Sequence, residues 1–241
     1  YHTDTGFPNA EAALLAVKAD YAKRHIPARY FQWDDWWMES LGDSPGMLSW
    51  VPIPTKFPSG FTDWLGLPLS LYAPRYSREN VWMDEYKWKV DNHNKSAIPL
   101  DPAFYQHLFA NGTTIGMKMF EQDFLCGTNT GGSLTNSDVS SGATWMANMN
   151  DAAVTHNISL QWCMMNPLHA LASTGYSQVS NGRGTRDNTR IDPHNILPMG
   201  LNGLLNYALG MYTSRDNVWT SPDDVEQPGC GDSNCVVGNR H

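Results

Sequence analysis

The sequence predicts an α/β fold, a (β/α)8 barrel that is incomplete at its C-terminal end because the last strand is missing. Stretches of strand and helix character alternate along the chain without an internal repeat, and such alternation produces a parallel sheet, either closed as a barrel or open and doubly wound. The length of 241 residues lies in the range of roughly 200–250 residues in which a barrel is one domain. No Gly-x-Gly-x-x-Gly or phosphate-binding loop follows a predicted strand, which disfavours the open, nucleotide-binding form.

The N-terminal part contains two expected helices and two expected strands. Residues 9–25 predict a helix, because apolar residues recur there at helical spacing and Asn9 can cap it. A buried strand is expected at 28–33 and a second strand at 67–72, with a short helix at 57–65 between them.

The middle of the chain begins with residues 80–95, which are polar and aromatic and predict a long loop or a short strand. A helix is expected at 101–110, where Asp101 is the cap and Pro102 occupies the first helical position. A strand follows at 114–120.

The remaining elements continue the same alternation. They are a Gly/Ser/Thr/Asn-rich loop at 127–142, helices at 144–156 and 196–209, and strands at 158–163, 176–180 and 211–213. We expect residues 1–241 to be one catalytic barrel domain of a longer, multidomain chain, since the sequence starts without an initiator Met and stops in a segment with loop character.

The composition excludes several classes of protein. The net charge of −8 and the lack of a basic stripe argue against nucleic acid as a partner, because phosphates are neutralised by clustered Lys and Arg. No apolar run is long enough for a membrane span. We expect neither a metal nor a cofactor, because zinc-type His and Cys spacings are absent, and a serine nucleophile elbow is absent as well.

Charged residues follow the predicted strands at the points where these strands end. In a parallel barrel the carboxyl ends of all strands meet at one mouth, where the active site is assembled. The residues at these positions are Asp34, Asp35, Arg75, Glu121, Asp123, Arg183, Asp187 and Asp216. Glycoside hydrolysis needs two carboxyl groups across the scissile bond, and the ten Trp and ten Tyr of the chain could supply rings that stack on sugars.

Four of these segments, taken in order, resemble the clan of glycoside hydrolases that contains α-galactosidases, α-N-acetylgalactosaminidases and raffinose-synthase-like proteins. Residues 30–38 (YFQWDDWWM) look like the first barrel strand of that clan, 117–126 (MKMFEQDFLC) like the fourth, 158–163 (ISLQWC) like the fifth, and 183–187 (RGTRD) like the Arg-x-x-x-Asp motif after the sixth. The similarity spans roughly residues 9–219.

The resemblance implies roles for particular residues. Asp123 is the nucleophile, Asp187 is the acid/base, and Arg183 binds the substrate. The Asp34–Asp35 pair binds sugar hydroxyls. The remaining expected substrate-binding residues are Trp36, Arg75, Glu121, Trp162 and Asp216, and Asp216 is also the reserve candidate for the acid.

Two positions depart from the pattern of the clan. Glu121 stands where α-galactosidases have Lys, two residues before the nucleophile, and Met164 stands where they commonly have Glu. Both positions bind the sugar, so specificity for galactose does not transfer.

The expected activity is that of a retaining glycosidase, for which the carboxyl groups of Asp123 and Asp187 should lie ~5–5.5 Å apart, against ~6.5–9.5 Å for inversion. Two alternatives stay open. One is a catalytically inactive relative that binds glycans or serves as a structural glycoprotein, and the other is a transglycosylase.

Sequons and cysteines favour a secreted or lumenal protein. Asn94, Asn111 and Asn157 each begin an Asn-x-Ser/Thr sequon. Cys230 and Cys235 lie in one polar loop, where a small local disulfide fits. Cys126 and Cys163 form either a second disulfide, if their Cα atoms come within ~7 Å, or two free buried thiols.

Overall fold

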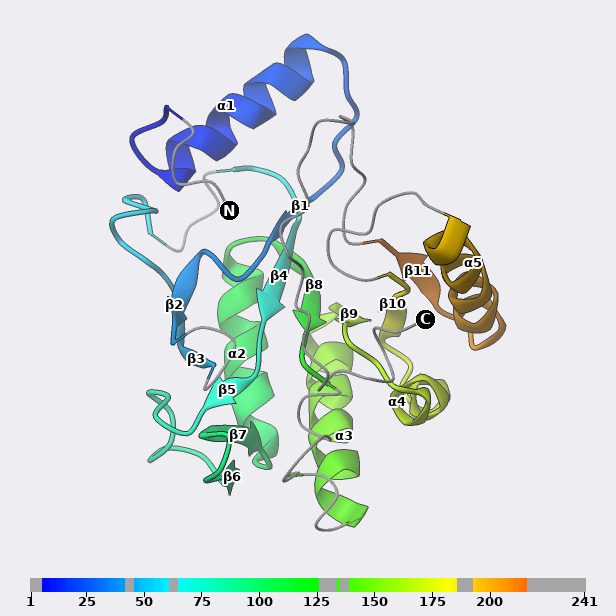
Figure 1. Ribbon diagram of the computed structural model, residues 1–241. Helices are drawn as coiled ribbons and strands as arrows, with labels where there is room; N and C mark the ends of the chain where they lie inside the picture. Colours follow the sequence, from blue (N-terminus) through cyan, green and yellow to red (C-terminus); the bar gives the residue numbers. More distant parts are fainter. Residues whose placement is uncertain are drawn as a thin grey trace.

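A six-stranded parallel sheet forms the centre of the computed structural model, which describes residues 6–41, 46–60, 65–125, 134, 139–185 and 193–215. The order of the strands is β1-β4-β8-β9-β10-β11 (Figure 1). Their bounds are β1 Phe31–Trp33, β4 Leu69–Ala73, β8 Met117–Gln122, β9 Ser159–Trp162, β10 Val179–Arg183 and β11 Tyr212–Ser214. The sheet is an open half-barrel, which confirms the expectation of an incomplete (β/α)8 barrel.

The position of β8 in this sheet differs from the expectation. The resemblance placed this strand fourth, but β8 is third in the sheet, because only β4 lies between it and β1. β9 and β10 are each one place earlier for the same reason.

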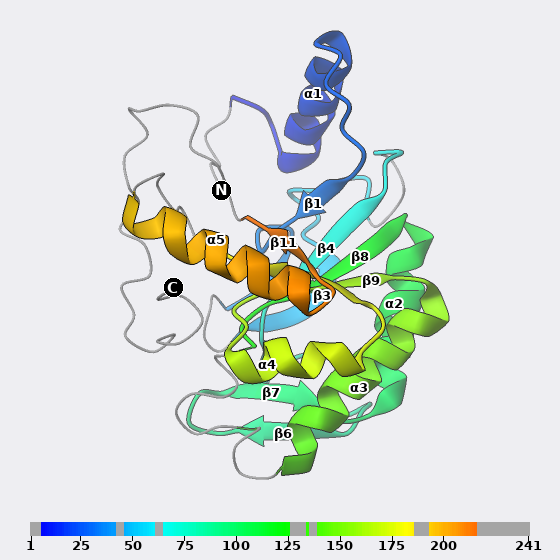
Figure 2. The ribbon, with the colours of Figure 1, turned by 90° about the vertical axis from the view of Figure 1, so that its right-hand side faces the viewer.

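The helices lie outside the sheet and follow the predicted alternation. Their bounds are α1 Ala10–Lys23, α2 Pro102–Thr114, α3 Val139–His156, α4 Pro167–Ala172 and α5 Pro193–Ala208. α2 and α3 lie side by side on one face of the sheet, and α5 lies against β11 (Figures 1 and 2). Both predicted caps are confirmed: Asn9 accepts from the backbone N–H of Ala12, and Asp101 accepts from that of Ala103.

Two local expectations need correction. The short helix expected at 57–65 is not formed in its described part, where residues 57–60 contain a turn and no helix. α4, which the sequence analysis did not identify, begins with a capping box in which Asn166 accepts from the backbone of His169 and the His169 ring accepts in return.

A second, five-stranded sheet was not predicted. Its order is β2-β3-β5-β7-β6, and its strands are β2 Met38–Ser40, β3 Met47–Pro52, β5 Tyr76–Ser77, β6 Trp88–Asp91 and β7 Ser96–Pro99. The backbone N–H of Met47 donates to the carbonyl of Arg75 (2.8 Å), so β3 begins beside the segment that follows β4. Gly46 permits this approach, because its φ is +109° and a Cβ there would lie 2.2 Å from the Arg75 carbonyl oxygen.

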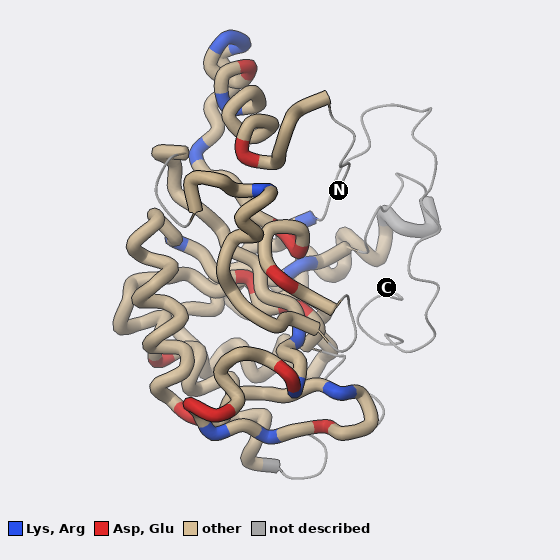
Figure 3. Tube along the Cα trace, turned by 90° about the vertical axis from the view of Figure 1, so that its left-hand side faces the viewer, with Lys and Arg blue, Asp and Glu red and all other residues tan. Residues whose placement is uncertain are grey.

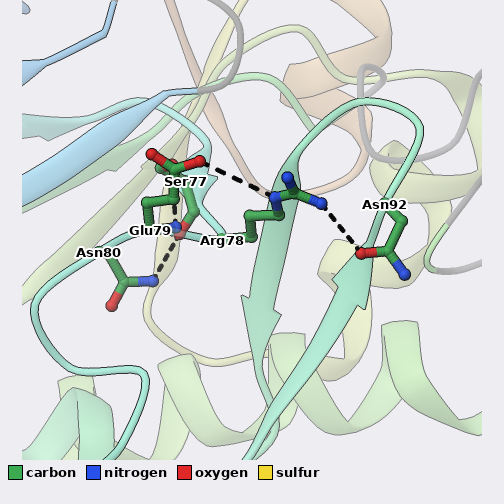
Figure 4. A network of polar contacts seen from close by, with 5 residues as sticks. All are labelled: Ser77, Arg78, Glu79, Asn80 and Asn92. Carbon is green, nitrogen blue, oxygen red and sulfur yellow. Dashed lines mark hydrogen bonds and ion pairs between the residues drawn. The ribbon is translucent and has the colours of Figure 1, made fainter.

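The turn after β5 is held by a small polar network (Figure 4). The Asn80 amide donates to the Ser77 carbonyl (2.6 Å), and the Glu79 backbone N–H donates to the Ser77 hydroxyl (3.1 Å). Arg78 pairs with Glu79 and also donates to Asn92 (3.2 Å), which joins this turn to the connection between β6 and β7.

The apolar core lies between the parallel sheet and the helices α2 and α3. Phe120 on β8 packs against Phe109 and Tyr105 of α2, and the indole N–H of Trp145 on α3 donates to the Tyr105 hydroxyl (2.8 Å). The opposite side of the sheet is therefore the side on which polar residues can gather. Among the described residues, no helix has the length and apolar character that crossing a membrane requires, and Lys and Arg are dispersed along the described trace (Figure 3).

Candidate active site

Side chains alternate along β8, and the alternation separates the core from the candidate site. Phe120 and Gln122 face the helices, where Gln122 contacts the hydroxyls of Tyr76 and Tyr105. Glu121 and Asp123 therefore point to the opposite face, the interior of the half-barrel. The neighbouring strands place Tyr72 and Gln161 opposite Glu121.

Asp123 lies just past the carboxyl end of β8, at the mouth of the half-barrel, and the residue is 5% exposed. The Tyr72 hydroxyl donates to its Oδ2 (2.8 Å), and the backbone N–H of Phe124 donates to its Oδ1 (2.6 Å). Phe124 adopts a left-handed φ of 56°. Each carboxyl oxygen of Asp123 is thus held by a donor, which fixes the orientation of the side chain.

Tyr72 remains a hydrogen-bond donor over the whole physiological pH range. Burial raises the pKa of its phenol well above the ordinary value, and the nearby charges of Asp123 and Asp34 raise it further. The ionised phenolate is therefore excluded, and the contact between Tyr72 and Asp123 persists.

Glu121, beside Asp123, has a strongly perturbed carboxyl group. Gln32 on β1 and Gln161 on β9 hydrogen-bond to it. Burial raises the pKa of Glu121 to about 8; the charges of Asp123 and Asp34 also raise it, whereas Gln161 and Arg183 act in the other direction. At neutral pH the protonated form of Glu121 is therefore favoured.

Arg183 ends β10 on the same face of the sheet. Its Nε donates to the Thr185 carbonyl (3.1 Å), and its Nη1 donates to the Cys163 sulfur (3.3 Å). Because Arg183 also acts on the pKa of Glu121, the structure places its guanidinium group near Glu121.

Cys163 is a free, buried thiol, which departs from the disulfide considered with Cys126. Its sulfur faces Arg183, and burial, followed by the charge of Asp123, raises the pKa of the thiol well above its ordinary value. Cys126 itself lies outside the described residues. Of the two open alternatives, the free thiol holds for Cys163.

The segment after β1 supplies three of the expected substrate-binding residues. Asp34 accepts from the backbone N–H of Asp35 (2.8 Å) and lies close enough to raise the pKa of Glu121 and Tyr72. Asp35 and Trp36 line a pocket of about 610 Å³ together with Tyr72. Tyr72, which lines this pocket, also donates to the carboxyl group of Asp123.

Of two further expected substrate-binding residues, Trp162 lies away from the candidate site and Arg75 contacts the residue that follows Asp123. Trp162 is fully buried and contacts Tyr176, and it alternates with Gln161, so it faces away from the half-barrel interior. Its assignment to substrate binding was wrong, because strand alternation puts it on the core side. The guanidinium of Arg75 lies 4.7 Å from the centroid of the Phe124 ring, so Arg75 supports the segment after Asp123 by a cation–π contact.

Several predicted residues fall outside the described part of the chain. These are Asp187, Asp216, Cys126, Cys230 and Cys235. Among the residues that the structure does describe, no cluster of His, Cys, Asp and Glu could hold a metal ion.

Sequence reasoning missed Tyr72, Gln32 and Gln161. A signal for the two glutamines was present, because each interrupts a short stretch that otherwise predicts a buried, apolar strand. Nothing local distinguished Tyr72, whose role depends on a carboxylate 51 residues away.

The comparisons with known proteins give a fold and no closer relationship. No family model matches the chain, and no curated protein matches its sequence. Crystal structures of a β-L-arabinopyranosidase of glycoside hydrolase family 27 from Geobacillus stearothermophilus are similar in fold. The arabinose complex of an alanine variant gives a TM-score of 0.61 at 16% sequence identity over 86% of this chain, and the wild-type enzyme gives 0.61 at 15% over 86%.

This chain spans 57% of the length of each of those two structures. At such identities the likeness concerns the architecture alone. The chain therefore has the fold of the family 27 glycosidase barrel, with Asp123 at the carboxyl end of one of its strands.

Proposed function

We propose that this chain is the catalytic barrel of a retaining glycoside hydrolase, with Asp123 as the nucleophile and Asp187 as the acid/base. The observation that carries the proposal is the buried carboxylate of Asp123, each oxygen of which is held by a donor at the mouth of a family 27-like barrel. Arg183 and Asp34, close to it, supply groups that can bind sugar hydroxyls.

The proposed reaction has two steps. An oxygen of Asp123 attacks the anomeric carbon, the bond to the leaving group breaks, and Asp187 gives its proton to the leaving oxygen. Asp187 then takes a proton from water, the water oxygen attacks the anomeric carbon, and the bond to Asp123 breaks. Tyr72 and the Phe124 N–H keep the carboxylate aimed through both steps.

A panel of aryl glycosides tests this proposal. Because the similar structures are those of a β-L-arabinopyranosidase and the sequence resembles α-galactosidases, the panel includes β-L-arabinopyranosides, α-galactosides and α-N-acetylgalactosaminides. We expect Asp123→Asn to reduce kcat by at least ~10³-fold, the effect of about 4 kcal/mol of lost transition-state stabilisation. The exposed Asp84 provides the matched control, Asp84→Asn, which should retain activity.

A mechanism-based sugar that traps the covalent intermediate gives the second readout. Mass spectrometry should find the label on the peptide that contains Asp123. Turnover that survives Asp123→Asn, or a label on another residue, would refute the nucleophile.

A second candidate function is glycan binding without catalysis. It is favoured by Glu121 and Met164, which replace two sugar-binding residues of the α-galactosidase pattern. Saturable binding of a glycan, without turnover of any panel member and without labelling of Asp123, would identify this alternative.

We also propose that the protein passes through the secretory pathway and carries a glycan on Asn157. Asn157 is exposed and follows α3 with a φ of 52°, whereas Asn94 is half-buried and donates to Asp91 (2.7 Å). Expression in a secretory host should therefore give occupancy at Asn157 and less at Asn94. Peptide mass spectrometry with Asn157→Gln as the control measures this, and an unmodified Asn157 would contradict it.

A further inference from the structure

We propose that the pocket beside Tyr72, which β2 and β3 of the second sheet line in part, binds a second sugar residue of a neutral oligosaccharide. This inference rests on the proposed function, in which Asp123 attacks the first sugar. It assigns a role to β2 and β3, which are not part of the barrel sheet, and it makes the substrate an oligosaccharide rather than a single sugar on a small leaving group.

The position of the pocket connects it to the candidate nucleophile. Tyr72 lines the pocket and its hydroxyl donates to Asp123 at 2.8 Å. Asp35 and Trp36, from the segment after β1, line the same pocket. When the anomeric carbon of the first sugar lies at Asp123, the second sugar residue of the chain would thus occupy the pocket beside Tyr72.

The size and the lining of the pocket suit a sugar residue. Its volume of about 610 Å³ falls in the range of roughly 300–1,000 Å³ for small-molecule sites. Trp36 is half-buried and its ring stacks on Phe57 (5.6 Å between centroids), so the ring is a fixed part of the wall. Leu48 and Met38 add apolar surface. An indole beside aliphatic groups is a surface on which the apolar face of a pyranose stacks.

The polar groups of the pocket favour a neutral ligand. Asp35 and Glu39 are exposed carboxylates that can accept hydrogen bonds from sugar hydroxyls. The ammonium group of Lys56 donates to the Trp36 carbonyl (2.8 Å) and so anchors the wall. The pocket thus has two carboxylates, from Asp35 and Glu39, and one cation, Lys56, which is already hydrogen-bonded to a backbone carbonyl. This excess of negative charge repels uronic acids and other acidic sugars.

The pocket is also firmly attached to the barrel. The indole N–H of Trp50 on β3 donates to the Tyr72 carbonyl (3.0 Å), and Met47 at the start of β3 donates to the Arg75 carbonyl (2.8 Å). These two hydrogen bonds connect β3 to the end of β4, at Tyr72, and to the segment just after β4, at Arg75. The distance between the pocket and Asp123 is therefore set by the fold, which a subsite for a defined chain geometry requires.

Methyl NMR of methionine tests the proposal without relying on turnover. Met38 lines the pocket, and its ¹³C-methyl signal is assigned from the spectrum of Met38→Leu. In Asp123→Asn protein, raffinose or maltotriose at about 10 mM, tenfold above a weak Kd of ~1 mM, should shift this signal. Methyl α-galactoside and a galacturonic acid trimer should not shift the Met38 signal. The signal of Met83, which does not line the pocket, is the internal control and should not move with any of these sugars.

Variants of the pocket provide the matched comparison. Leu48→Trp fills the pocket, and Glu39→Ala removes a hydrogen-bond acceptor that also contacts Ser49. Both variants should raise the Kd obtained from the Met38 shift about tenfold or more. Val51→Trp, at an exposed position of the same strand, should leave it unchanged. The proposal is overturned if neither oligosaccharide shifts Met38, if methyl α-galactoside shifts it equally, or if both pocket variants keep the full shift.

The outcomes separate this proposal from the proposed function. Hydrolysis of aryl glycosides without a Met38 shift would leave the glycosidase in place and remove the second sugar site. A Met38 shift in a protein that hydrolyses no glycoside would remove the catalytic role of Asp123 and keep the pocket as a glycan-binding site.

Discussion

Glu121 and Asp123 are two residues apart on one face of β8, and both side chains are almost fully buried. Two carboxylates this close cannot both be ionised at low cost. The hydrogen bonds from Tyr72 and the Phe124 N–H are made to Asp123, whereas it is Glu121 whose pKa is raised to about 8. The site therefore holds the carboxyl group of Asp123 by two hydrogen-bond donors and raises the pKa of its neighbour Glu121.

This arrangement predicts a pH-dependent stability that Glu121→Gln should remove. The pKa of Glu121 is about 8 in the folded protein, against the ordinary value of 4.5, so the folded state binds the proton more tightly than the unfolded state. The stabilisation is complete below about pH 4.5 and is lost as the pH rises towards 8. A glutamine at this position would keep the shape of the side chain without the titration.

Thermal unfolding measured from pH 5 to pH 8 checks this expectation. The Tm of Glu121→Gln relative to the wild type should rise with pH, by at least the ~2–4 °C that 1 kcal/mol produces in a domain of this size. Glu85→Gln, at an exposed position, is the control. A Tm difference that does not change with pH would show that Glu121 is ionised throughout.

At the scale of single elements, α4 depends on a neutral histidine. The backbone N–H of Asn166 donates to Nδ1 of His169 (3.2 Å) to close the capping box at the start of the helix. Burial lowers the pKa of His169 to about 4. Protonation of Nδ1 would remove the acceptor that the cap needs.

The sign of the pH effect is opposite to that for Glu121. Because the pKa of His169 is lowered from 6.5 to about 4, its contribution to stability is present above about pH 6.5 and is lost as the pH falls towards 4. We expect the wild type to lose more Tm than His169→Gln between pH 7 and pH 5, since Gln can also occupy this capping position. His107→Gln, at an exposed position, is the control, and equal losses in wild type and His169→Gln would contradict the expectation.

The elements show which local features the sequence could predict. The caps at Asn9 and Asp101 were predicted correctly, because a cap bonds to a backbone N–H only a few residues away. α4 was missed because its cap uses a histidine, which is not among the usual partners in a capping box. The second sheet was missed because its strands are short, and because its two hairpins, β2–β3 and β6–β7, are joined only by the two-residue strand β5.

On the scale of the whole molecule, Phe104 connects the two sheets. It lies on α2, which packs against β8, and its ring makes edge contacts with Tyr76 of β5 and Trp88 of β6. It is fully buried. An aromatic cluster around this side chain thus helps to hold the second sheet to the barrel, in addition to the hydrogen bonds of β3.

Phe104→Ala should destabilise the protein by about 3–5 kcal/mol, the usual cost of deleting a buried aromatic ring. Denaturant unfolding measures this loss. Phe7→Ala, at a position where the ring is 44% exposed, should cost much less. A loss below about 1 kcal/mol for Phe104→Ala would mean that the two sheets are held together by other contacts.

The α/β alternation and the place of Asp123 at the end of a strand could be predicted from the sequence, because both follow from periodicity and from the termination of one local element. Which polar groups meet at that place was decided by the tertiary structure. Tyr72 reaches Asp123 across 51 residues and Gln32 reaches Glu121 across 89. Such contacts depend on the order and register of strands that are distant in the chain, and so does the face on which Trp162 is buried. A local pattern specifies the element to which a residue belongs, whereas strand pairing determines the residues that it contacts.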